Sequence, residues 1–155
     1  MMTLADVIEI EAGPHLIFEW FREMEANYGK WHPDHVRWTH AAGGFTEGGL
    51  CHVEEHIHGK LHKMDAVYTK IMKDRRIEYD FRFPMSLICP RGAFDIRPAD
   101  GKCVFTATLD FRGGKLVSWL FRSRVEAVKA HMKEEGENLK RILEQDRGGV
   151  TRKDK

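Results

Sequence analysis

Apolar residues occupy every second position over much of the segment from Leu50 to Phe111, and this alternation constrains the fold more than any other feature. The clearest runs are Ile77, Tyr79, Phe81 and Phe83, and then Cys103, Phe105, Ala107, Leu109 and Phe111. A period of two turns one face of a strand toward a core and the other toward water. With turn-like residues between the runs, the sequence predicts an antiparallel meander with strands at about 50–57, 61–72, 77–83, 92–97 and 103–111.

The segments before and after this meander contain helices. A short strand is expected at 7–11. An amphipathic helix follows Gly13-Pro14, and its apolar face is formed by Ile17, Trp20, Phe21, Met24 and Tyr28. Residues 29–49 are rich in glycine and are predicted as turns and short helical pieces. After Gly113-Gly114 the chain has no proline, and a long C-terminal helix is predicted from the apolar positions Val117, Leu120, Phe121, Val125, Val128, Met132, Leu139 and Ile142.

An early helical hairpin, an antiparallel sheet and one long final helix are typical of the α+β helix-grip class, which is START-like and Bet v 1-like. In this class a curved sheet wraps around the C-terminal helix, and analogy with the class implies an apolar cavity between them. The length of 155 residues suits one domain, which we place at residues 1–146. Residues 147–155 are polar and are predicted to form a frayed tail.

Charge and hydropathy exclude several classes of protein. The 25 basic and 24 acidic residues give a net charge of +1, which offers no basic face for nucleic acid. A helix that spans a bilayer needs about 20 apolar residues, and no apolar run is close to that length. The first residues do not have the pattern of a secretory signal. We therefore expect a cytoplasmic protein without a membrane partner. Cys51, Cys89 and Cys103 are odd in number and widely spaced, and are predicted as small core residues.

Two polar residues interrupt the apolar stripe of the C-terminal helix. His131 and Glu135 are four positions apart, which places them side by side at roughly 5–6 Å between Cβ atoms. They share one face with Val128, Leu139 and Ile142. A buried carboxylate needs a partner, and a divalent metal would satisfy both side chains at once. The alternative is a pair at the exposed edge of the stripe.

Seven of the nine histidines fall between positions 32 and 62, namely His32, His35, His40, His52, His56, His58 and His62. Such clustering favours a metal but does not select its ligands. In the first long strand Glu55 lies on the same side as Val53 and Ile57, which predicts that Glu55 points inward and Glu54 outward. A bulge after Gly49 would reverse this register.

The run Tyr28-Gly-Lys-Trp-His-Pro-Asp-His35, with the strand glutamate and the final H-x-x-x-E, resembles the 2,4-diacetylphloroglucinol hydrolase family. The resemblance covers about residues 24–59 and the helix around His131, and it implies a START-like fold with one zinc ion. It assigns the metal ligands to His35, Glu55 (or Glu54), His131 and Glu135. It assigns Tyr28 to the substrate's phenolic oxygen. His32 or His58 is a candidate for orienting a ligand carboxylate.

The resemblance implies a zinc-dependent hydrolase that cleaves a carbon–carbon bond next to a ketone in an acylated phenol. Zinc lowers the pKa of a bound water toward about 7 and polarises a carbonyl. Two alternatives remain open: a carrier or binding protein for a hydrophobic small molecule, and a polyketide cyclase or aromatase. In each of them the partner is a small hydrophobic or aromatic molecule, and a homodimer is possible.

Overall fold

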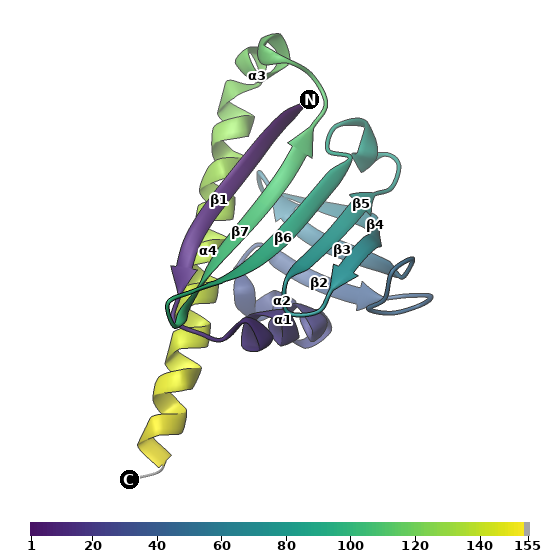
Figure 1. Ribbon diagram of the computed structural model, residues 1–155. Helices are drawn as coiled ribbons and strands as arrows, with labels where there is room; N and C mark the ends of the chain where they lie inside the picture. Colours follow the sequence, from purple (N-terminus) through teal and green to yellow (C-terminus); the bar gives the residue numbers. More distant parts are fainter. Residues whose placement is uncertain (154–155) are drawn as a thin grey trace.

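Seven strands form one antiparallel sheet in the order β1-β7-β6-β5-β4-β3-β2. The computed structural model describes the backbone of residues 1–153 and the side chains of residues 1–145 (Figure 1). The strands are β1 (Met2–Ile10), β2 (His35–His40), β3 (Leu50–Ile57), β4 (Lys60–Met72), β5 (Arg76–Phe81), β6 (Arg91–Ala99) and β7 (Lys102–Phe111). The helices are α1 (Pro14–Arg22), α2 (Met24–Trp31), the short 3-10 helix η1 (Met85–Leu87), α3 (Lys115–Leu120) and α4 (Arg122–Lys153).

The alternation along the strands buries one face of the sheet, as predicted. On β7, Cys103, Phe105 and Ala107 are buried while the residues between them are more exposed. On β5, Ile77 and Tyr79 are buried and the residues beside them are more exposed. These side chains meet the buried faces of α1 and α2, where Phe21 stacks on Phe94 with ring centroids 4.4 Å apart. The three cysteines are buried and free, which confirms their predicted place in the core.

The long helix α4 runs beside β1 and β7 and extends past the end of the sheet (Figure 1). Gly136 permits this contact, because a Cβ added there would lie 2.7 Å from an Asp6 carboxylate oxygen on β1. Met132, Leu139 and Leu143 form the buried stripe of the helix. The arrangement is the predicted α+β helix-grip fold, with an antiparallel sheet packed on a long C-terminal helix.

Three local predictions are corrected. The segment His35–His40 forms strand β2 rather than a turn, because its backbone pairs with β3 although its side chains do not alternate regularly. The first helix divides at Glu23, whose φ of −91° and ψ of 32° redirect the chain so that α2 packs against β2. The C-terminal helix divides at Phe121, and the apolar side chains before that break lie at the surface instead of on the buried stripe.

The prediction for the C-terminal end stays a prediction. The domain boundary at 146 and the frayed tail at 147–155 fall on residues whose side chains lie outside the described part of the chain. Residues 154 and 155 lie outside it entirely. Within residues 1–153, no helix combines the length and the apolar character that a membrane crossing requires.

Candidate metal centre

Strands β2 and β3 and helix α4 bring two histidines and two glutamates together, and these four residues form the cluster at the candidate metal centre. His35 is the first residue of β2, and Glu55 on β3 is its direct partner across the strand pair. His131 and Glu135 lie one turn apart on α4. One ligand atom from each of these four residues lies within 4.8 Å of all the others, and the group can therefore hold a metal ion.

Hydrogen bonds between α2 and α4 fix the position of the helical pair. The indole Nε1 of Trp31 donates to the backbone carbonyl of Glu135 at 2.8 Å. The Nδ2 of Asn138 donates to the backbone carbonyl of Trp31 at 2.9 Å. Because α2 ends at Trp31 and β2 begins at His35, these bonds also hold α4 against the start of β2.

The geometry centres on one carboxylate oxygen. Glu135 Oε1 lies 2.8 Å from His35 Nε2 and 2.8 Å from His131 Nε2. Glu55 Oε2 lies 3.7 Å from His35 Nε2. The side chain of His35 is fully buried, and those of Glu135 and Glu55 are 15% and 19% exposed. Two imidazoles and two carboxylates therefore share a small region that is largely shielded from water.

The ring of His35 is held in a defined tautomer. Its Nδ1 lies 3.0 Å from the backbone carbonyl of Tyr28, which can only accept, so Nδ1 carries the proton. Nε2 then faces the carboxylates and is hydrogen-bonded to Glu135 Oε1 at 2.8 Å. A bound metal would take the place of a proton on this nitrogen. The Tyr28 ring stacks on the imidazole at a centroid distance of 3.9 Å and an angle of 3°. This orientation suits a metal ligand, whose second nitrogen commonly donates to a carbonyl.

His131 Nε2 is a buried nitrogen without a hydrogen-bond partner among the described residues. Its 2.8 Å approach to Glu135 Oε1 is a close charge contact that lacks hydrogen-bond geometry. An unpartnered buried nitrogen is costly, and a cation between the imidazoles and the carboxylates would remove that cost. Imidazole nitrogen and carboxylate oxygen are both ligands that zinc accepts. The four side chains thus fit a divalent metal.

The pKa values of the two glutamates shift in opposite directions. Burial raises the pKa of Glu135, but the contacts with His131 and His35 outweigh it and lower that pKa to about 2. Burial and the neighbouring Glu135 raise the pKa of Glu55 above its ordinary value. Burial lowers the pKa of His131, but the nearby Glu135 outweighs that effect and the net shift is upward. A dication would favour the charged form of both carboxylates and the neutral form of the imidazoles.

Tyr28 contacts the candidate metal centre directly. Its hydroxyl donates to Glu55 Oε2 at 2.9 Å, and its ring contacts the indole of Trp38 at 5.3 Å. The predicted contact of Tyr28 with a substrate oxygen stays a prediction, because this hydroxyl is hydrogen-bonded to Glu55. The structure adds a role that the sequence did not suggest, which is to orient Glu55.

Glu54 lies on the opposite face of β3. Its carboxylate is 3.5 Å from Lys63 Nζ, 3.5 Å from His52 Nε2 and 3.9 Å from Arg37 Nε. The register of β3 against β4 is continuous, so the bulge that would have exchanged the two glutamates is absent from this strand pair. Glu55 is therefore the glutamate that joins the cluster.

A second group of polar side chains lies behind His131. The His32 ring packs 4.1 Å from that of His131, and its Nε2 lies 2.7 Å from Glu134 Oε2. Asp34 Oδ2 lies 3.9 Å from His131 Nδ1. His32 therefore contacts Glu134 and not a carboxylate of the cluster, and His58 is exposed in a turn, so neither orients a ligand carboxylate. No pattern in the sequence indicated a role for Asp34 or Glu134.

The group of His32, Asp34 and His131 also has ligand atoms within 4.8 Å of one another. However, His32 Nδ1 accepts the backbone N–H of Asp34 at 3.0 Å. That lone pair is not available to a metal, so this group is better described as a support for His131.

The apolar space beside the centre is small. An internal cavity of about 10 Å³ is lined by Phe21, Met24, Trp38, Phe45, Tyr68, Ile77 and Phe94. This volume is close to the minimum that holds one water molecule. A larger hollow of about 360 Å³ lies on α4, but its lining is polar or charged and includes none of the four cluster residues. This aromatic pocket is nearly filled, and no residue of α4 lines it, so it differs from the predicted cavity between the sheet and the C-terminal helix. A substrate that enters it would have to displace side chains.

Comparison with protein families gives one match over most of the chain. The model of the family described as "Polyketide cyclase / dehydrase and lipid transport" matches residues 1–144. A sequence search among curated proteins gives no significant match.

Solved structures show the same fold at low sequence identity. Ara h 8.0201 superposes with a TM-score of 0.71 at 15% identity, over 93% of this chain and 98% of its own. The Zhui aromatase/cyclase from Streptomyces sp. R1128 gives 0.72 at 13% identity, over 93% and 94%. A START superfamily protein from Mycobacterium smegmatis gives 0.70 at 14% identity, over 92% and 97%.

Proposed function

Because the chain belongs to the polyketide cyclase/dehydrase and lipid transport family, we propose that it binds a small hydrophobic or aromatic molecule in the aromatic pocket between the sheet and helices α1 and α2, and acts on it with the help of one zinc ion. The reaction we propose is hydrolysis of a carbon–carbon bond next to a ketone in an acylated phenol. Water supplies OH to the acyl carbon and H to the ring carbon, which releases a carboxylic acid and the deacylated phenol. The three buried, unpaired cysteines are consistent with a cytoplasmic location.

The observation that carries this proposal is the convergence of His35, Glu55, His131 and Glu135, with a buried imidazole nitrogen left unpartnered. These four residues would hold the zinc. When bound, zinc lowers the pKa of a coordinated water and polarises a carbonyl oxygen. The proton on His35 Nδ1 is held by the Tyr28 carbonyl, so that Nε2 stays oriented toward the centre.

Tyr28 connects the centre to the aromatic pocket. Burial raises the pKa of its hydroxyl above the usual range, and the nearby Glu55 raises it further, so the group stays protonated and acts as a donor rather than a base. Its ring contacts Trp38, which also lines the pocket. We therefore assign Tyr28 to the phenolic oxygen of the substrate, with Glu55 as its partner in the absence of substrate. Rings of Trp38, Phe45 and Tyr68 supply apolar surface for an aromatic ligand.

A second candidate is a metal-independent binding protein or aromatase/cyclase. It is supported by the family match and by the similarity in fold to an aromatase/cyclase and to a START superfamily protein. This candidate uses the same aromatic pocket and leaves the four polar residues as a hydrogen-bonded cluster.

Elemental analysis of the purified protein, followed by an assay with diacetylphloroglucinol, separates the candidates. We expect about one zinc per chain and release of acetic acid that stops with a chelator and returns with added zinc. Glu55→Gln should reduce both zinc content and acid release, whereas Glu54→Gln, on the other face of β3, should change neither. Saturable binding of the compound without acid release, in a protein that takes up no metal, would establish the second candidate.

A further inference from the structure

Exposed apolar side chains gather at one end of the molecule. The described residues expose thirteen large hydrophobic side chains, and eight of them belong to two short segments. These are Phe83, Leu87 and Ile88 in the loop around η1, and Leu116, Val117, Trp119, Leu120 and Phe121 in and just after α3. We refer to these eight as the apolar tip. Both segments lie at the end of the sheet away from α1 and α2 (Figure 1).

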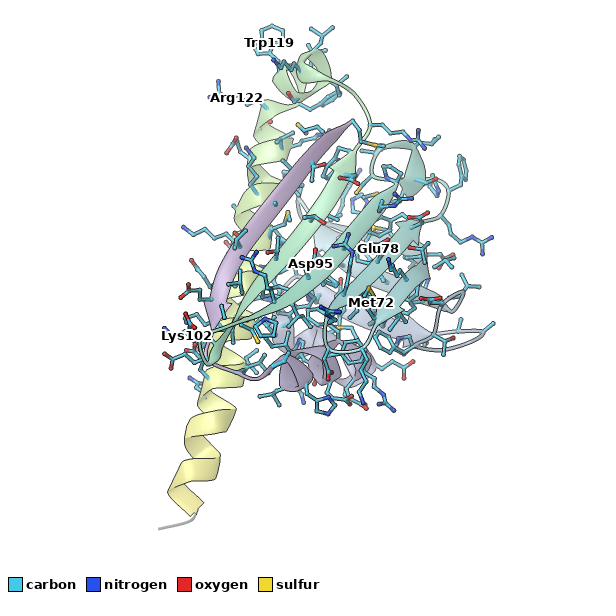
Figure 2. All side chains as sticks on the ribbon, viewed as in Figure 1. Met72, Glu78, Asp95, Lys102, Trp119 and Arg122 are labelled. Carbon is cyan, nitrogen blue, oxygen red and sulfur yellow. The ribbon has the colours of Figure 1, made fainter. Side chains whose placement is uncertain are left out.

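The two segments are joined through Arg112. Its backbone N–H donates to the carbonyl of Ile88 at 2.8 Å, and its Nε donates to the carbonyl of Ser86 at 3.1 Å. Arg112 lies between the end of β7 and α3, so these bonds tie the loop to the segment that leads into α3. Figure 2 shows Trp119 of α3 pointing away from the body of the protein, with Arg122 beside it.

Helix α3 carries its four apolar residues on one side and Lys115 and Ser118 on the other. Trp119 and Leu116 are each 69% exposed, and Leu120 is 61% exposed. The polar group between them, the Ser118 hydroxyl, donates to the backbone carbonyl of Lys115 at 3.0 Å and so does not need water. A helix whose apolar side is exposed and whose other side is polar is suited to lie in the plane of a membrane interface.

The charged side chains within the two segments of the apolar tip have a single sign. Residues 81–88 and 111–125 contain no Asp or Glu, although the whole chain has 24 acidic residues against 25 basic ones. Their basic side chains are Arg82, Arg112, Lys115, Arg122 and Arg124. None of these forms an ion pair with a described residue, and Arg124 lies over the Phe121 ring at 5.6 Å. Such a border is complementary to an anionic surface.

We propose that the apolar tip is a membrane-docking surface that inserts α3 into the interface of a bilayer containing anionic lipids. Trp, Phe and Leu are the side chains that enter the headgroup–acyl boundary, and neighbouring Lys and Arg bind the acidic headgroups. A symmetric contact of these two segments with a second copy would bring their basic side chains together, and neither segment supplies an acidic residue. The absence of a spanning helix, on which the sequence-based expectation of no membrane partner rested, does not bear on surface docking. This inference does not depend on the proposed enzymatic function.

Sedimentation with vesicles tests the proposal on the full chain. We expect binding to phosphatidylcholine vesicles containing phosphatidylglycerol, weaker binding to pure phosphatidylcholine, and loss of binding at high salt. Neutralising two charges with Lys115→Gln and Arg122→Gln should weaken binding about 25-fold, at about fivefold for each charge near the surface. Trp119→Ser with Leu120→Ser should weaken it at least about tenfold.

Two controls separate insertion from other effects. Val36 is also an exposed apolar residue, at 49%, and Val36→Ser should leave vesicle binding unchanged because it lies on β2 outside the apolar tip. Tryptophan fluorescence should shift to the blue on binding, since Trp119 is far more exposed than Trp20 or Trp31, and Trp119→Phe should bind while losing most of the shift. Equal binding to neutral and anionic vesicles, or no binding, would overturn the proposal. So would a dimer in solution that Leu120→Ser dissociates.

Discussion

Replacing Glu135 by alanine is expected to abolish zinc binding while leaving the domain folded. Glu135 Oε1 is the atom closest to both imidazoles, at 2.8 Å from each, so its removal takes away the centre of the ligand set. Without metal the variant loses a partner for His35, which costs about 1–3 kcal/mol for an unsatisfied buried group. This loss is offset in part, because the like charge of Glu135 no longer disfavours ionised Glu55.

The effect of zinc on stability gives the magnitude. A ligand that binds the folded state alone stabilises it by about 2.7 kcal/mol when its free concentration is 100 times the Kd. For a domain of this size each kcal/mol moves the midpoint of thermal unfolding by about 2–4 °C, so zinc should raise the wild-type midpoint by about 5–11 °C. The variant should show no such rise.

Thermal unfolding followed by circular dichroism, with chelator and with zinc, measures this difference, and elemental analysis gives the metal content. Glu134→Ala is the matched control, because Glu134 is adjacent on α4 but bonds to His32 instead of joining the cluster. If Glu135→Ala is too unstable to isolate, Glu135→Gln keeps the side-chain volume. A wild-type midpoint that does not respond to zinc, or a variant that keeps the full response, would refute the reasoning.

Three further predictions concern neighbouring residues. Glu55→Ala should lower zinc affinity while Glu54→Ala does not, because the two side chains lie on opposite faces of β3; zinc titration of both variants compares them. Tyr28→Phe should slow turnover of the acyl-phenol without changing zinc content, because it removes one hydroxyl and no metal ligand, and steady-state kinetics with metal analysis tests this. Gly92→Ala should destabilise the fold by about 1–3 kcal/mol in urea unfolding, because the new Cβ would lie 2.4 Å from the buried Tyr79 ring.

A different result would contradict each of these three predictions. Loss of zinc from Glu54→Ala alone would mean that the strand register is wrong by one residue. Loss of zinc from Tyr28→Phe would show that the hydroxyl acts on Glu55 and the metal rather than on the substrate. For the glycine, Gly114→Ala is a control, since a Cβ there meets nothing within 4 Å; equal effects of the two substitutions would exclude the steric explanation.

The periodicity of the sequence was sufficient to predict most of the fold. The five strands of the meander and the long C-terminal helix follow from local repeats of two and of three to four residues, which depend on backbone geometry alone. The same repeats placed His131 and Glu135 on one face of α4, and Glu55 on the inner face of β3. Strand β2 was missed because its residues alternate poorly and its structure depends on pairing with β3.

The tertiary structure decided which distant residues meet. Seven histidines lie between positions 32 and 62, and no local pattern distinguishes His35 from the others. The family resemblance selected His35 as the metal ligand. In the structure, the pairing of β2 with β3 brings His35 next to Glu55 and the helical pair on α4. The hydrogen bond of Tyr28 to Glu55 likewise joins residues 27 positions apart. The sequence placed Val117, Leu120 and Phe121 on the buried stripe because their spacing is helical. A helical period records which side chains share a face, but whether that face meets the core or the solvent depends on where the chain turns, and here it turns at Phe121.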